Sequence, residues 1–268
     1  MEALSLPQID YDFWKEKNSY YSSKKLDNQT IRGIKTAQKT GLLNSVIDDD
    51  GNILIKSNAD LIEIIVEKIK NFDLVKSSNN ELLEIFDLIQ AWGGSTGRAP
   101  YVRPKGDEWR FRNIEEYANT YREAIKVIIN LKSKPLDDAS IKKVVELICR
   151  LDGVAGPFAT KHLLFWSTGL NLEIKLPIYD SRMKLLIRGA NKLSSAPNYT
   201  EFKKALEHQG RQSNIGSEII ERALFAFSKN YFPNENLEIV KDYSLSKDIE
   251  VAENLSKWWN QLKLKDYE

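Results

Sequence analysis

The sequence is poor in the side chains that bind metals and form covalent cross-links. Its 268 residues include one cysteine, Cys149, and two histidines, His162 and His208. A single cysteine excludes a disulfide framework, a cysteine-rich zinc site and a cysteine-ligated iron–sulfur cluster. Metal chemistry would therefore depend on carboxylates, and we expect neither a metal nor a cofactor.

Long apolar runs and a strong charge of one sign are also missing. No stretch approaches the ~18–20 apolar residues that span a bilayer, and the first seven residues lack the basic and apolar regions of a secretory signal. We therefore expect a cytoplasmic protein with no membrane partner. The 39 basic and 38 acidic residues give a formal charge of +1. There is thus no overall attraction to nucleic acid, and any such attraction must be local.

What the sequence does contain is helical periodicity. Apolar residues recur every three or four positions in many segments, namely 61–69, 82–89, 117–129, 141–150, 157–167, 181–188, 199–208, 217–229 and 249–263. One short hairpin is expected where Asp50-Gly51 separates two apolar stretches. The pattern predicts an all-α protein with at most a small β-hairpin near 45–55. We expect residues 1–28 to form an arm, and residues 29–268 to form one large domain or two lobes.

The segment 137–166 predicts two helices joined by a tight turn. The first helix ends near Arg150, the turn Gly153-Val154-Ala155-Gly156 follows, and Pro157 takes the first position of the second helix, where its missing N–H costs nothing. Such a turn exposes backbone N–H groups beside the positive end of a helix dipole, which suits one DNA phosphate and reads no sequence. Alternatively, the two glycines only cap and connect packed helices.

The order of motifs after this turn carries a family resemblance. Residues 151–156 read Leu-Asp-Gly-Val-Ala-Gly, an apolar helix follows, and Pro177-Ile178-Tyr179-Asp180 then leads into another helix. This order resembles the helix-hairpin-helix (HhH-GPD) superfamily of DNA glycosylases, and within it the 8-oxoguanine DNA glycosylase-like branch. The likeness covers roughly residues 137–230. It implies a two-lobed helical fold and a role in base excision repair.

The resemblance implies two catalytic residues. Asp180 matches the family's catalytic aspartate, and Lys161 matches the lysine that attacks the sugar in members with AP-lyase activity. The two positions are 19 residues apart, in keeping with such members. Counted from the hairpin glycines, however, the family's lysine position falls near Pro157, one turn before Lys161. Two structural roles stay open as well: Asp180 as the N-cap of the next helix, and the pair as an ion pair.

A flipped base needs a pocket and the DNA backbone needs cations. Residues 92–112 form a glycine-rich loop with five basic and two acidic residues. Its aromatic residues are candidates for the base pocket, or alternatively for anchors to the core: Trp92, Tyr101, Trp109 and Phe111. Segment 134–192 has ten basic and six acidic residues. Besides the hairpin, the expected DNA contacts are Arg98, Arg103 and Arg182. We expect His162 to be a core or hydrogen-bonded histidine.

Three functions are compatible with these observations. The first is a DNA glycosylase, with AP-lyase activity if Lys161 attacks, that acts on duplex DNA with a flipped, 8-oxoguanine-like base. The second is a catalytically inactive hairpin protein that binds DNA or a protein partner, as occurs in bacterial antiphage gene sets. The third is a helical scaffold in which the hairpin pattern is coincidental. We expect a monomer, and no protein partner is identifiable.

Overall fold

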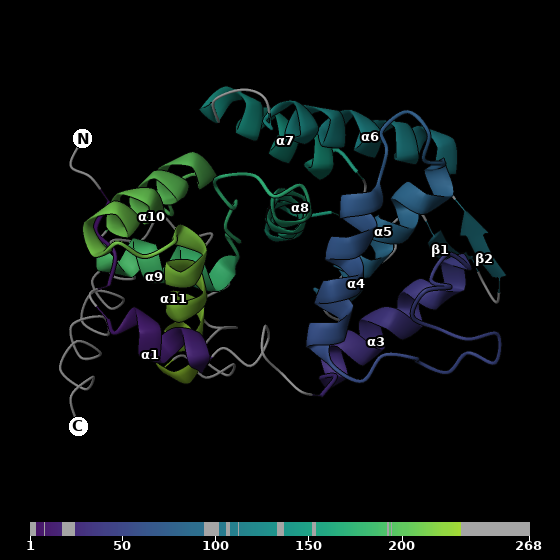
Figure 1. Cartoon of the computed structure of the whole chain (residues 1–268), viewed down its shortest axis with the longest axis horizontal. Coiled ribbons are helices and arrows are strands. Elements are labelled where there is room, and N and C mark those ends of the chain that lie inside the picture. The colour runs from purple at the N-terminus through teal and green to yellow at the C-terminus, as the bar shows by residue number, and fades with distance from the viewer. Residues whose placement is uncertain are drawn as a thin grey trace. The chain divides into compact units, whose positions relative to one another are not determined.

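The computed structural model describes residues 4–7, 9–17, 25–93, 102–105, 108–111, 113–132, 137–151, 154–191, 193 and 195–231. The chain divides into two compact units, each described here by itself. One unit combines Met1–Ser19 with Pro177–Glu268, and the other is Tyr20–Leu176. Helices dominate both units, as the periodicity predicted (Figure 1). No helix in the described ranges is long and apolar enough to cross a bilayer.

In the unit Tyr20–Leu176, the described residues form six α-helices and a short 3-10 helix. Their bounds are α3 (Asn28–Ala37), η1 (Gln38–Thr40), α4 (Asn58–Asn71), α5 (Asn79–Trp92), α6 (Ile114–Asn130), α7 (Asp138–Cys149) and α8 (Gly156–Gly169). Local sequence fixes their starts. Ser57 and Ser78 each form a capping box with the acidic residue three positions later, which satisfies two backbone N–H groups at each helix start.

Helix α5 runs through the core of this unit. Every residue from Leu82 to Trp92 except Glu84 is buried, so apolar side chains surround the helix instead of lying on one face. Helices α3, α4, α6 and α8 all contact it. Its buried Asp87 accepts a hydrogen bond from the Thr40 hydroxyl at 2.9 Å. Because α8 packs on α5 and on α4, the hairpin has a fixed place within this unit.

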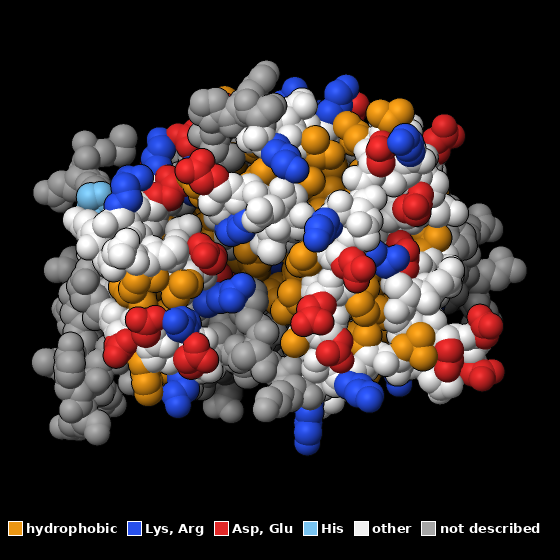
Figure 2. All heavy atoms as spheres, in the orientation of Figure 1, with side chains coloured by type: hydrophobic (Ala, Val, Ile, Leu, Met, Phe, Trp, Pro, Cys, Tyr) orange, Lys and Arg blue, Asp and Glu red, His pale blue; other side chains and the backbone are white. Residues whose placement is uncertain are grey.

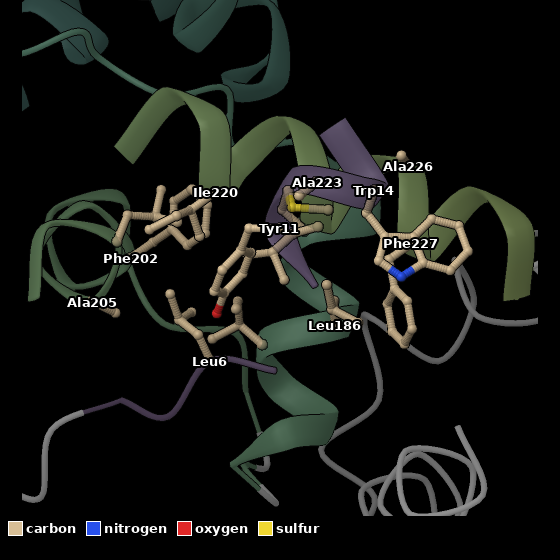
Figure 3. Packing of buried hydrophobic residues seen from close by; sticks show 14 of the residues in the cluster. Leu6, Tyr11, Trp14, Leu186, Phe202, Ala205, Ile220, Ala223, Ala226 and Phe227 are labelled. Atoms are coloured by element: carbon tan, nitrogen blue, oxygen red, sulfur yellow. The ribbon is translucent and has the colours of Figure 1, made fainter. Parts of the chain in front are cut away.

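The other unit packs the N-terminal helix α1 (Tyr11–Glu16) with three helices from the end of the described chain. These are α9 (Ser181–Ala190), α10 (Tyr199–Ser213) and α11 (Ser217–Tyr231). Figure 3 shows their shared core, where Trp14 meets Phe227 edge-on with ring centroids 5.5 Å apart. Part of the predicted arm is therefore a helix that packs into this core. Its six residues are too few for sequence periodicity to reveal it.

One part of the fold prediction is wrong. Around Asp50-Gly51 an antiparallel bridge joins Ile47 and Ile53, within the expected limit of a small hairpin, but β1 (Val102–Lys105) also pairs antiparallel with β2 (Glu108–Phe111) in the region expected to be a loop. The register sets Val102 opposite Phe111 and Pro104 opposite Trp109. This alternation around a two-residue, glycine-containing connection is a hairpin signal, which the basic composition obscured.

Helix bounds also differ from the predicted ones. Helix α10 continues to Ser213, beyond the predicted end near 208, and closes at Asn214 in the left-handed conformation (φ 54°). Helix α7 starts after Asp137, whose side chain accepts from the Ser140 N–H. The predicted helix at 249–263 lies outside the described residues.

Candidate functional site

The two helices expected on either side of the turn are α7 and α8, which contact each other. Leu151 and Val154, on either side of the turn, are 3% and 6% exposed, and the Val154 N–H donates to the Leu151 carbonyl at 3.0 Å. Both side chains therefore anchor the turn to the protein core. A contact of Val154 with DNA would have to use its backbone. Gly153 lies outside the described residues.

Helix α8 begins without a side-chain cap. Its N-cap, Ala155, is exposed and has extended backbone angles (φ −89°, ψ 162°), and it makes no side-chain hydrogen bond to the first turn. Pro157 follows in the first turn, as predicted. A Cβ built on Gly156 would meet nothing within 4 Å, and Gly156 does not have a positive φ. The fold itself therefore does not require glycine at this position.

Lys161 lies one turn further along α8 and is half-buried. Its Nζ donates to the carbonyl oxygen of Gly93 at 3.3 Å. The same nitrogen is 4.2 Å from the centroid of the Phe158 ring and 5.9 Å from that of Trp92. The apolar neighbourhood expected from the sequence is present, and it consists largely of two aromatic rings, Trp92 at the carboxyl end of α5 and Phe158 in α8 itself.

A buried polar chain fixes the opposite face of α8. The indole N–H of Trp166 donates to the Tyr121 hydroxyl at 2.7 Å, and that hydroxyl lies 2.8 Å from Nδ1 of His162. Because an indole can only donate, the Tyr121 O–H is left to donate to Nδ1. The His162 ring also stacks on Phe86, 4.7 Å between centroids. Burial, and then the nearby Lys161 charge, lower the pKa of His162 to about 3. The predicted core role of His162 is confirmed.

Asp180 belongs to the other unit and begins α9. Its Oδ1 accepts a hydrogen bond from the Met183 N–H at 3.0 Å, so its expected role as an N-cap is confirmed. The residue is partly exposed. Since one carboxylate oxygen accepts from the backbone and each oxygen has two lone pairs, capping leaves further acceptor capacity on Asp180.

Two tyrosines hold the segment before Asp180 in place. The Tyr199 hydroxyl donates to the Pro177 carbonyl at 2.9 Å, and the Tyr179 hydroxyl donates to the Pro197 carbonyl at 2.7 Å. Tyr179 also stacks on Phe202 with 4.5 Å between centroids. We call the two tyrosines the tyrosine pair. Burial raises the pKa of Tyr179, and burial with nearby acidic groups raises that of Tyr199, so both hydroxyls stay protonated donors. Spacing along the sequence does not reveal this arrangement.

The remaining predicted site residues differ in their burial and in the element that carries them. Trp92 is 2% exposed and meets Phe165 edge-on, which favours the core-anchor alternative over stacking on a base. Arg182 is partly buried on α9. The backbone positions of three further residues lie in the strand pair: Arg103 in β1, and Trp109 and Phe111 in β2. Arg98 and Tyr101 lie outside the described residues.

The surface charges and cavities point to no other site. Figure 2 shows acidic and basic side chains interspersed over the visible described surface. A hollow of about 410 Å³ lies beside α4 and α5, but none of the predicted site residues lines it. Its Glu84 is already bonded to the Lys68 ammonium at 2.8 Å and to the Ser45 hydroxyl at 2.7 Å. The described residues contain no group of three or more His, Cys, Asp or Glu side chains placed to hold a metal ion.

Comparison with protein-family models, with curated proteins and with solved structures finds no match to this chain. A functional assignment must therefore rest on its own residues and their local geometry.

Proposed function

We propose that this protein is a DNA glycosylase of the helix-hairpin-helix type, with Lys161 as the nucleophile and Asp180 as the assisting carboxylate. Three local features support the proposal. A helical hairpin is present, a half-buried lysine follows on its second helix, and a partly exposed aspartate begins the next helix. The proposal includes an HhH-GPD-like fold with two lobes and a base-excision role.

The open start of α8 carries the proposal. A glycine that the fold does not require, next to an N-cap without a side-chain hydrogen bond, leaves room for an external group. The positive end of the helix dipole then favours an anion at this place. A DNA phosphate fits because it can approach the backbone closely where no Cβ intervenes. Such a contact positions the duplex without reading its sequence.

The chemistry would follow from a flipped nucleotide. The neutral Lys161 amine attacks C1′ while the glycosidic C–N bond breaks, and the departing base takes the electron pair and a proton. Positive charge develops on the sugar, and a nearby carboxylate stabilises it most strongly where water is excluded. We assign this role to Asp180 because of its match to the catalytic aspartate of the family that the sequence resembles. The attacking nitrogen gives up a proton to the departing base; its lone pair then forms the C=N bond as the C1′–O4′ bond breaks and O4′ takes a proton from water, and β-elimination from this Schiff base nicks the strand.

One observation favours a second candidate, a hairpin protein that binds DNA without catalysis. The contacts of Lys161 with a carbonyl oxygen and two ring faces would also suit a structural tie between α8 and α5. In that case the open start of α8 would still bind phosphate, and the lysine would never react.

Borohydride trapping separates the two candidates. The full chain is incubated with duplexes that contain 8-oxoguanine, uracil or an abasic site, and the reductant is added. The glycosylase with lyase activity gives a covalent adduct that Lys161→Gln abolishes and that Lys142→Gln, an exposed change on α7, leaves intact. Base release without an adduct assigns the attack to water and removes Lys161 as the nucleophile. Binding with neither release nor adduct overturns the proposal in favour of the binding protein.

A further inference from the structure

The contacts of the Lys161 nitrogen with Gly93, Phe158 and Trp92 suit a positive charge. Gly93, whose carbonyl oxygen accepts from Nζ, is the C-cap of α5, and the carboxyl end of a helix carries partial negative charge. The faces of Phe158 and Trp92 attract a cation through their ring quadrupoles. The carbonyl oxygen, the helix end and the two rings all favour the protonated form of Lys161. They stabilise the ammonium, whereas an amine can attack carbon only with its lone pair free.

Gly93 provides the space for this arrangement. Its backbone is in the right-handed helical region (φ −65°, ψ −10°), which residues with a side chain adopt readily. Conformation is therefore not the reason for a glycine here. A Cβ at this position would overlap the Phe158 ring and lie 3.0 Å from Lys161 Nζ. Any larger residue must displace the ring and the ammonium together.

We propose that the carboxyl end of α5 is a holding site that keeps the Lys161 ammonium out of reaction in the free protein. Gly93, Phe158 and Trp92 form this holding site. The lysine becomes a nucleophile only after its hydrogen bond to Gly93 breaks and its proton passes to water. Gly93 and Phe158 are thus positioning residues. The use of the released amine rests on the proposed glycosylase function, but the holding site itself does not.

His162 does not complicate the titration of Lys161. The charge of Lys161 contributes to lowering the pKa of His162 to about 3. The His162 ring is therefore neutral from neutral to alkaline pH. It therefore adds no charge near the lysine in the range where an amine loses its proton.

Competitive acetylation of the DNA-free protein tests the holding site. The full chain is labelled with acetic anhydride at a series of pH values, and peptide mass spectrometry follows Lys161 and Lys142, whose side chain is 75% exposed. We expect Lys161 to react up to about tenfold more slowly and its labelling midpoint to lie at higher pH, because a cation over an aromatic face gains up to about a decade in protonation. Equal midpoints for the two lysines would overturn the proposal.

Two variants separate charge stabilisation from loosening of the fold. Phe158→Leu and Gly93→Ala should each lower the labelling midpoint of Lys161. Gly169→Ala is the matched control. Gly169 lies in the same helix as Lys161 but at its far end, and a Cβ there would meet the Ile69 side chain of α4 at 2.5 Å. This control should cost similar stability and leave the midpoint unchanged. A midpoint unmoved by Phe158→Leu and Gly93→Ala, or moved equally by Gly169→Ala, contradicts the holding site.

Because this labelling needs no DNA, the outcome is independent of the glycosylase proposal. A raised midpoint without borohydride trapping keeps the holding site and rejects the lyase. Borohydride trapping together with an ordinary midpoint keeps the lyase and rejects the holding site.

Discussion

Helices α8 and α9, which begin with the two candidate functional segments, start in opposite ways. The N-cap of α8 makes no side-chain hydrogen bond to its first turn, whereas the N-caps of α1, α3, α4, α5, α6, α7 and α10 each make one. Helix α9 is capped by the Asp180 carboxylate. An uncapped start keeps its partial positive charge available to an external anion, whereas a capped start places a negative charge there instead.

The difference between α8 and α9 shows that the start of a helix can have two different roles. At α8 the residues are small, and the fold leaves their surroundings open. At α9 the preceding segment is fixed by the tyrosine pair, which gives the carboxylate a defined position. We infer that α8 would contact the DNA backbone and α9 would present a group to the sugar.

The largest effect is expected from a substitution that keeps the N-cap of α9 but removes its negative charge. Asn is as good an N-cap as Asp, so Asp180→Asn should leave thermal stability within a few tenths of a kcal/mol. Base release should fall about 10²–10³-fold, as when other electrostatic contacts to a transition state are removed. Asp180→Ala should show the same loss of rate and about 1 kcal/mol less stability. Single-turnover base release and urea unfolding measure the two quantities. A wild-type rate in Asp180→Asn would leave Asp180 as a cap only.

The buried His162 that helps to fix α8 can be tested by measuring the stability of the protein as a function of pH. His162 is neutral when folded because its pKa is about 3, whereas in the unfolded chain it titrates near 6.5. The unfolded state therefore binds more protons between these values, and stability should fall as pH drops from about 6.5 to about 3. The loss amounts to several kcal/mol, since each pKa unit corresponds to about 1.36 kcal/mol.

His162→Asn retains an acceptor for the Tyr121 hydroxyl and removes the titration. Urea unfolding at several pH values should therefore show a shallower slope for this variant over the same window. Equal slopes for the two proteins would mean that other groups cause the acid lability.

Adding a cap to α8 should change stability and DNA affinity in opposite directions. Ala155→Asp supplies the missing carboxylate, so the free energy of unfolding should rise by about 1 kcal/mol. Affinity for duplex DNA should fall about 10- to 100-fold, because a charge-assisted contact of 1.5–3 kcal/mol is lost and a like charge is added.

Ala155→Ser is the neutral control and should stabilise with little loss of affinity. Gly156→Ala should leave stability nearly unchanged and weaken binding, because a Cβ there meets only open space in the protein. Fluorescence anisotropy at fixed salt measures the affinities. Unchanged DNA binding in both Ala155→Asp and Gly156→Ala would show that the start of α8 does not contact phosphate.

The smallest effects are expected at the tyrosine pair. Tyr179→Phe and Tyr199→Phe each remove one hydrogen bond and leave a prolyl carbonyl without its donor, at a cost of about 1 kcal/mol. Both bonds hold the segment that leads to Asp180, so base release should fall with similar size in the two variants. A loss of stability without any change in base release would limit the pair to a structural role.

Much of the helical framework was predictable because its signals are local. The periodicity of 82–89 predicted the buried helix α5, and Pro157 marked the first turn of α8. The strand pair at 102–111 escaped prediction because aromatic and basic residues there have several structural explanations. Helix α1 escaped because so short a helix depends on packing against α11.

The two candidate catalytic residues were named from sequence order, and the sequence also predicted the capping role of Asp180. The partners of Lys161 could not be predicted, since Gly93 is 68 residues away along the chain. The tyrosine pair was hidden for the same reason, because its bonds join positions 22 and 18 residues apart.

The sequence by itself determined a mainly helical chain, the hairpin between two helices, and the capping aspartate, because periodicity, proline placement and capping act within a few residues. Only the tertiary structure decided that the start of α8 is open, that Lys161 rests on the carboxyl end of α5, and that two tyrosines hold the approach to Asp180. These features depend on which distant side chains share a space, and packing of the whole chain sets that.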